Sequence, residues 1–132
     1  MTLISCAEWF ETQAEALTEK VVFIFGMDDP AESDAVSYQF AKVGETPVEF
    51  FDFERRIHEV YFTIYIDNAL GWKAQEQEFE THSKYILDWV YDDPTLGGNC
   101  VCARHTGWIE VELPDNSPLQ SRVLTLEIET NL

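Results

Sequence analysis

The cysteines are the first residues of this chain whose chemistry would matter: Cys6, Cys100 and Cys102. Cys100 and Cys102 lie two positions apart, so an extended segment would place both thiols on one face. A structural zinc site needs a closed set of Cys and His ligands, and no second pair stands at a matching spacing. Three cysteines also do not make a disulfide framework. We therefore expect reduced, partly buried thiols and no bound metal.

The three histidines are the next candidates, because imidazole is the commonest general acid or base near neutral pH. We expect His58 at the start of a strand, His82 near the polar side of a long helix, and His105 in a hairpin turn. The sequence holds no His-Glu-x-x-His, no Gly-x-Ser-x-Gly and no Cys–His signature. Neighbouring carboxylates are common by chance among 25 acids, and most should lie on solvated faces. The sequence therefore predicts no catalytic residue, no cofactor and no enzyme activity.

The segment DDPTLGGNC at 92–100 is the strongest candidate for a phosphate-binding loop. A P-loop leads from a strand into a helix and carries a lysine after its last glycine, whereas this segment follows a helix and lacks that lysine. Two glycines after a helix instead provide left-handed residues that reverse the chain. We predict a structural corner of five residues: Asp93, Thr95, Leu96, Gly97 and Gly98. Within it, Leu96 should enter the core while the glycines turn the backbone.

Acidic residues outnumber basic ones by 25 to 8, which gives the chain a formal net charge of −17. Such a surface repels phosphate backbones, so groove or single-strand nucleic-acid binding is not expected. The plain interpretation of this charge is solubility, or a high-salt or acid-tolerant source. Two more specific interpretations stay open: a protein surface to which DNA must not bind, and a mimic that competes with DNA.

Length and composition indicate one folded domain over 1–132. A chain of 132 residues fits a single domain, and 45% hydrophobic residues supply a core. No run approaches the roughly 18 apolar residues that span a membrane. The opening segment MTLISCAEWFETQAEAL carries acids and no early Lys or Arg, so we expect no signal peptide and a cytosol-like compartment.

The elements that must position these residues can be read from hydrophobic spacing. The capping box SCAE at 5–8 and a stripe at three- and four-residue steps predict a helix over about 6–19. VVFIF at 21–25 predicts a strand covered on both faces. A weaker strand should cover 33–43, and GETP at 44–47 should turn the chain.

The second half of the chain alternates strand, helix and strand signals. The segment 47–67 should be mostly strand, with one core-facing set: His58, Val60, Phe62, Ile64 and Ile66. A long helix should cover about 72–91 and bury a stripe formed by Trp72, Phe79, Ile86 and Val90. The last forty residues should form a three-stranded meander. This order predicts an α+β fold: a largely antiparallel sheet with an N-terminal helix and a long second helix packed on one face.

An aromatic group stands among acids in PVEFFDFE at 47–54, where Phe50, Phe51 and Phe53 precede the long strand. Packing in the core would explain it. A protein–protein contact would explain it equally well, because exposed aromatic residues near loops are common anchors. Both interpretations stay open.

The order of elements and the corner also carry a resemblance. A strand ends near IYID, a long helix ends in WVYDDPTLGG, and strands follow up to SRVLTLEIETNL. In this order the chain resembles the tail-terminator (tail-completion or minor tail) proteins of long-tailed bacteriophages. Those proteins have a similar length, an N-terminal helix and a helix-ending Asp-x-Thr-Leu-Gly-Gly corner, here at 93–98. The acidic segment GMDDPAESDAVSYQFAKVGETP and the aromatic residues at 50–53 depart from that pattern.

The resemblance implies an α+β subunit that forms a homo-hexameric ring on the end of the tail tube and stops tube growth. Its partners would be the tail tube protein and the neck or head-completion (stopper) protein. DNA would pass through the lumen without specific binding, and no membrane would be involved. The protein would be assembled in the host cytoplasm and would reside in the tail or neck of the virion.

A ring of six such acidic copies would need its basic residues at subunit contacts. We expect intersubunit ion-pair donors at Arg55, Arg56, Arg104 and Arg122. The aromatic residues Phe50, Phe51 and Phe53 would add a subunit or partner contact. Acids of the 28–35 loop or the pairs Glu110/Glu112 and Glu127/Glu129 would line the lumen. The rival hypothesis is an acidic inhibitor, such as an immunity protein or DNA mimic, that blocks a basic partner.

Overall fold

The structure is a computed structural model that describes residues 2–26, 36–50, 53–67, 69–109 and 119–131. The side chains of 49–54 lie outside the described part. The aromatic group at 50–53 and the expected lumen acids at 28–35, 110 and 112 therefore fall outside it as well.

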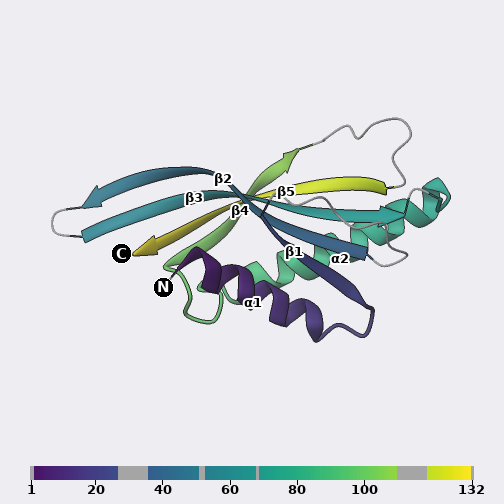
Figure 1. The fold of residues 1–132 in the computed structure, drawn as a ribbon, viewed down its shortest axis with the longest axis horizontal. Helices are drawn as coiled ribbons and strands as arrows, with labels where there is room; N and C mark the ends of the chain where they lie inside the picture. Colours follow the sequence, from purple (N-terminus) through teal and green to yellow (C-terminus); the bar gives the residue numbers. More distant parts are fainter. Residues whose placement is uncertain (1, 27–35, 51–52, 68, 110–118, 132) are drawn as a thin grey trace.

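The described chain forms two helices and a five-stranded sheet (Figure 1). The elements in chain order are α1 (Leu3–Glu15), β1 (Val21–Phe25), β2 (Val36–Phe50), β3 (Phe53–Asp67), α2 (Trp72–Asp92), β4 (Cys102–Ile109) and β5 (Leu119–Asn131). The sheet order is β1-β2-β3-β5-β4, and only the β1–β2 pair is parallel. The predicted α+β class, with a largely antiparallel sheet and helices packed on it, is confirmed.

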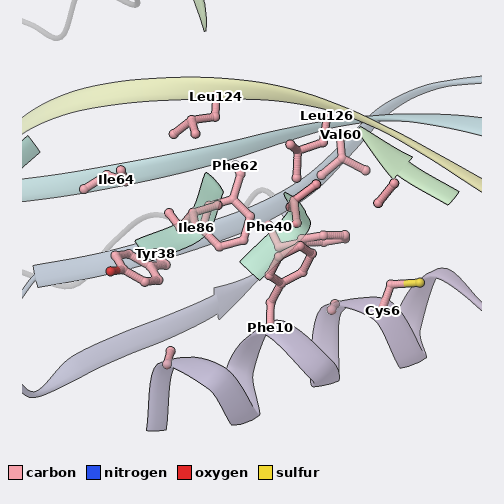
Figure 2. Packing of buried hydrophobic residues seen from close by; sticks show 14 of the residues in the cluster. Cys6, Phe10, Tyr38, Phe40, Val60, Phe62, Ile64, Ile86, Leu124 and Leu126 are labelled. Carbon is pink, nitrogen blue, oxygen red and sulfur yellow. The ribbon is translucent and has the colours of Figure 1, made fainter. Parts of the chain in front are cut away.

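The core lies between one face of the sheet and the two helices. Phe10 of α1 reaches Phe62 of β3, with ring centroids 5.1 Å apart, and also contacts Phe40 of β2 (Figure 2). From α2, the fully buried Ile86 enters the same cluster. The sheet residues involved occupy alternate positions, as expected when only one face of a strand is buried. Both helices therefore cover the same face.

The predicted core face of β3 is confirmed. Val60, Phe62, Ile64 and Ile66 are at most 1% exposed, and His58 is also buried. Their neighbours on β5 follow the register, since Phe62 pairs with Leu124 and Val60 with Leu126. A one-residue slip would turn this whole set to the other face, so the alternation fixes the register of the two central strands.

The first helix begins earlier than the sequence suggested. It covers Leu3–Glu15 rather than 6–19, and Thr2 is the N-cap instead of Ser5. The Ser5 N–H donates to Oγ1 of Thr2 at 3.0 Å. Threonine satisfies a free first-turn N–H as serine would, so the predicted capping box was wrong by one turn of helix.

Two expectations about the first strands are wrong. β1 is an edge strand, and most of its residues are half-buried rather than covered on both faces. GETP at 44–47 does not turn the chain, because β2 continues to Phe50 with an irregularity between Lys42 and Gly44. Beyond Phe40, β2 has no β1 partner, so Pro47 lies in an edge segment, where proline is tolerated.

The long helix is confirmed, with its bounds at Trp72–Asp92. Phe79, Ile86 and Val90 are buried as expected. Trp72 is not part of the stripe, because its position in the first turn, next to the N-cap Gly71, leaves it 76% exposed.

The C-terminal strands differ from the expected meander. A strand was expected over 99–104 with His105 in a turn after it, but β4 runs from Cys102 to Ile109 with His105 inside it. The ladder shifts between His105 and Gly107, so an irregularity in one strand replaces the expected turn. The strand expected around 111–113 lies outside the described residues.

The predicted corner between α2 and β4 is confirmed. Leu96 is completely buried, and Gly97 and Gly98 have φ of 70° and 83°. Leu96 itself has a φ of 51°, which the sequence did not indicate. Burial of its side chain holds Leu96 in a conformation that usually favours glycine.

Alanine at Gly97 should destabilise the protein more than alanine at Gly98. Both place a side chain on a backbone with positive φ, at a cost of about 1–2 kcal/mol. At Gly97 the new Cβ would also lie 2.7 Å from Nε1 of Trp9, whereas nothing lies within 4 Å at Gly98. Urea unfolding followed by circular dichroism measures the free energies. Gly71→Ala is the control, since φ there is −64° and the space is open. If Gly97→Ala lowers the free energy of unfolding no more than Gly71→Ala does, then the corner does not require glycine at position 97.

Candidate functional site

The corner is held by hydrogen bonds to one carboxylate. Oδ2 of Asp93 accepts from the Gly97 N–H at 2.9 Å, and Oδ1 accepts from the Thr95 hydroxyl at 2.8 Å. Oγ1 of Thr95 in turn accepts from the Gly98 N–H at 3.2 Å. The hydrogen bond from the Thr95 side chain, and then that from the Gly97 N–H, lower the pKa of Asp93 below its ordinary value. These contacts explain why an aspartate and a threonine precede the two glycines.

Two buried thiols lie beside this corner. Cys6 of α1 donates to the Asn99 carbonyl at 3.3 Å, and Cys100 donates to the Pro94 carbonyl at 3.5 Å. The hydrogen bond with Cys6, followed by burial, raises the pKa of Cys100, so its thiol stays protonated. All three cysteines are free thiols, as expected. The contacts of Cys6 and Cys100 link α1 to the corner.

A polar group lies beneath the sheet around His82. His82 is completely buried, so its expected place near the polar side of α2 is wrong. The reason is spacing: His82 stands three residues after Phe79 and four before Ile86, on the same buried stripe. Its Nδ1 is hydrogen-bonded to the hydroxyl of the buried Tyr38. Burial, and then the charge of Glu19, raise the pKa of Tyr38 and keep the hydroxyl protonated.

Two carboxylates meet the other ring nitrogen of His82. Its Nε2 lies 3.2 Å from Oε2 of Glu78 on α2 and 3.2 Å from Oε2 of Glu19, which follows α1. This group was not predicted from the sequence. The spacing of Glu78 and His82 by four residues on a helix could have indicated their contact. Nothing in the sequence places Glu19 beside them, because that contact depends on tertiary structure.

The four arginines expected at subunit contacts each pair with an acid of their own chain. The pairs are Arg55–Glu129 (3.3 Å), Arg56–Glu45 (3.1 Å), Arg104–Glu127 (3.2 Å) and Arg122–Glu76 (2.8 Å). The arginine side chains still range from 36% exposed at Arg122 to 54% at Arg104. Exposed pairs of this kind stabilise a fold by only about 0–1 kcal/mol. A second acid from another molecule can therefore compete for these guanidinium groups at little cost.

The arginines do not form one site. Arg55 and Arg104 meet neighbouring acids of β5 on the sheet face opposite α1 and α2, which we call the helix-free face. Arg122 lies on the other face, where it bonds both carboxylate oxygens of Glu76 and covers the ring of Phe79. The structure therefore brings Arg55 and Arg104 to one side of the molecule and Arg122 to the other.

The helix-free face carries acids and a shallow hollow. Glu59 of β3 lies opposite Glu127 of β5 in the ladder, and Glu127 lies opposite Arg104 of β4. A hollow of about 220 Å³ opens here between the strands, and it is lined by Glu59, Val60, Tyr61, Thr106, Ile109, Thr125, Leu126 and Glu127. Its mixture of carboxylates, hydroxyls and a half-buried tyrosine suits contact with a polar protein surface.

Comparisons with known proteins add no family to this picture. No family model matches the chain, and no curated protein matches it either. In the described part of the chain, neither helix combines the length and the apolar character needed to cross a membrane. The expectations that the chain is not an enzyme and needs no cofactor or metal stay predictions.

Replacing Tyr38 by Phe should destabilise the protein by about 1–3 kcal/mol, because Nδ1 of the buried His82 would lose its hydrogen-bond partner. Urea unfolding of Tyr38→Phe measures the change. Tyr91→Phe is the control, since the Tyr91 side chain is 63% exposed. Equal unfolding free energies for the two variants would contradict the role of the Tyr38 hydroxyl.

Replacing Asp93 by Asn should have an effect that depends on pH. A carboxyl whose pKa is lowered in the folded state stabilises the fold above its unfolded pKa of about 3.9, and this contribution disappears as the pH falls through the folded value. The thermal midpoint of Asp93→Asn should therefore lie below that of the parent at neutral pH, and the gap should close in acid. The control is Asp92→Asn, at an exposed neighbour. A gap that stays constant down to the acid limit would rule out this role of Asp93.

Proposed function

We propose that this chain caps the tail tube of a long-tailed bacteriophage as a homo-hexameric ring. In this role it ends tube growth and joins the tail to the neck or head-completion (stopper) protein. Its other partner is the tail tube protein. It acts as a structural component of the virion tail or neck after assembly in the host cytoplasm.

The observation that carries the proposal is the order of elements around the corner. An N-terminal helix, a strand ending at Asp67, the long α2, the Asp93–Gly98 corner and a following strand occur in the order that the resemblance implies. The corner residues fill distinct structural roles: Asp93 caps, Leu96 is buried and both glycines have positive φ. The corner is therefore a defined structural turn in this fold. This supports the use of the motif, together with the order of elements, as evidence for the proposed function.

The shape of the subunit supports assembly into a ring. The β2–β3 hairpin extends past the helices (left in Figure 1), so part of it has no helix packed against it. Neither helix covers the helix-free face. A ring needs two such complementary surfaces on each copy, because each subunit contacts a neighbour on either side. The hairpin and the helix-free face are the surfaces that we assign to these contacts.

The contact residues remain those expected from the sequence. Arg55 and Arg56 lie on β3 within the extended hairpin, and Arg104 pairs with Glu127, which lines the hollow of the helix-free face. The guanidinium group of each arginine can donate to a carboxylate of a neighbouring subunit in addition to its own partner. We keep Arg122 and the aromatic residues Phe50, Phe51 and Phe53 in the proposal as contact residues, the last three without a described geometry.

The charge of the chain suits a ring through which DNA passes. Six copies, each with a net charge of −17, would present a lumen that repels phosphates and lets DNA slide without specific binding. Glu127 and Glu129 of β5, which the sequence suggested for the lumen, lie on the helix-free face and pair with arginines of their own chain, so we assign them to the subunit contact instead.

A second candidate function is that of an acidic inhibitor or DNA mimic that blocks a basic partner. The observation in its favour is the same surplus of 25 acids over 8 basic residues. All four arginines named above already pair with acids of their own chain, so the arginines would not compete with a cationic protein for the remaining acids. Such a protein would act as a monomer, and its binding would weaken steeply with salt.

The test of the proposed function is assembly on tails and the mass of the purified chain in solution. Arg55→Glu/Arg56→Glu should lower the number of capped tails of correct length, because the contact would set like charges against each other. Lys73→Glu/Lys84→Glu is the matched control, with the same charge change on exposed positions of α2. Thermal unfolding establishes that both variants are folded.

The outcomes separate the two functions. A folded Arg55/Arg56 variant that fails to cap tails, beside a control that caps them, supports the ring contact. Normal tails from that variant would remove Arg55 and Arg56 from the contact. A chain that stays monomeric at every concentration, leaves tails uncapped and binds a cationic nuclease would replace the ring by the inhibitor.

A further inference from the structure

We propose that Glu19, Glu78 and His82 form a binding site for a divalent transition-metal ion of the Zn²⁺ type. The site would link the segment after α1 to α2, directly beneath the sheet. It is independent of the proposed ring, and it goes against our sequence-based expectation that the chain binds no metal.

The three ligand atoms lie at distances that suit one ion. Nε2 of His82 is 3.2 Å from a carboxylate oxygen of Glu19 and 3.2 Å from one of Glu78. All three atoms lie within 4.8 Å of one another. A tetrahedral zinc with ligand bonds of about 2.0–2.1 Å sets its ligand atoms about 3.3 Å apart. The two spacings from Nε2 of His82 already match this value. Rotation of the half-exposed Glu19 side chain would shorten the third spacing, between the oxygens of Glu19 and Glu78.

The orientation of the histidine is fixed as it is in known metal sites. A metal-binding imidazole typically uses its second nitrogen in a hydrogen bond that holds the ring in place. Here Nδ1 of His82 is hydrogen-bonded to the Tyr38 hydroxyl, and the Tyr38 ring packs against the imidazole edge to face. His82 and Tyr38 are both completely buried. Nε2 therefore lies next to the two carboxylates, and the orientation of the imidazole ring is already fixed before an ion binds.

The charge at this point favours a cation. Two carboxylates meet Nε2, so three electronegative atoms converge on at most one proton. Among the ion pairs of the described residues, Glu19 and Glu78 pair only with His82, and no Lys or Arg reaches them. Two carboxylates brought this close repel each other unless a cation lies between them. A divalent ion would balance both.

The mixture of ligands selects the class of ion. Imidazole suits zinc and other late first-row metals, whereas magnesium and calcium prefer oxygen ligands alone. Access is open from solvent, because the side chains of Glu19 and Glu78 are 46% and 35% exposed. Water would complete the coordination on that side. An ion that binds only the folded chain would raise the midpoint of thermal unfolding.

The full chain is first stripped of metal with a chelator. Zinc binding is then measured by calorimetric titration with ZnCl₂, and the midpoint of thermal unfolding is measured with and without zinc. We expect one zinc per chain and a higher midpoint, with no comparable rise from MgCl₂ at the same concentration. Glu19→Gln/Glu78→Gln should weaken zinc binding by at least about tenfold while the apo protein stays folded. These side chains are partly exposed and nearly isosteric with Gln, so the test does not depend on replacing the buried histidine.

The matched control is Glu15→Gln/Glu80→Gln, which removes the same charge from exposed positions of α1 and α2. This control should bind zinc like the parent. Equal zinc binding by the parent and by Glu19→Gln/Glu78→Gln would overturn the proposal, as would binding lost only when Cys100 is replaced. Failure of the parent to bind zinc would overturn it as well, and would identify the group as a set of ion pairs at the margin of the core.

Discussion

The burial of a single face of the sheet by both helices is the constraint on which the rest of the structure depends. Phe62 at the centre of β3 meets Phe10 from α1, Phe40 from β2 and Tyr38 beside it, all on one face. The alternation of β3 then fixes the register with β5, because a slip would expose the whole apolar set. The opposite face of the sheet is left without a helix.

The same packing places the polar groups. Because α2 turns its 79–90 stripe towards the sheet, His82 is carried into the core, where Tyr38 satisfies one ring nitrogen. The other nitrogen is left to meet Glu19 and Glu78 at the margin of the core. The corner after α2 is likewise fixed by apolar packing, because the buried side chain of Leu96 anchors the segment that leads from α2 to β4. Both groups show polar side chains located by apolar packing.

The sequence predicted what depends on local spacing. The fold class, the bounds of β1 and α2, the core face of β3 and the two left-handed glycines follow from periodicity and backbone preference. It failed where tertiary context decides: β2 runs through a Pro-containing segment because it is an edge there, and Trp72 is exposed because it stands in the first turn of α2. Glu19 and His82 are 63 positions apart in the chain, and only packing brings them together.

We propose that the chain closes tail tubes as a six-membered ring through its hairpin and its helix-free face. Electron microscopy of tail tubes ended by the purified chain tests this most directly. A ring of this kind would give sixfold density at the tube end, with the β2–β3 hairpin of each copy against the helix-free face of its neighbour. Density without sixfold symmetry, or tubes that continue to grow in the presence of the chain, would contradict it.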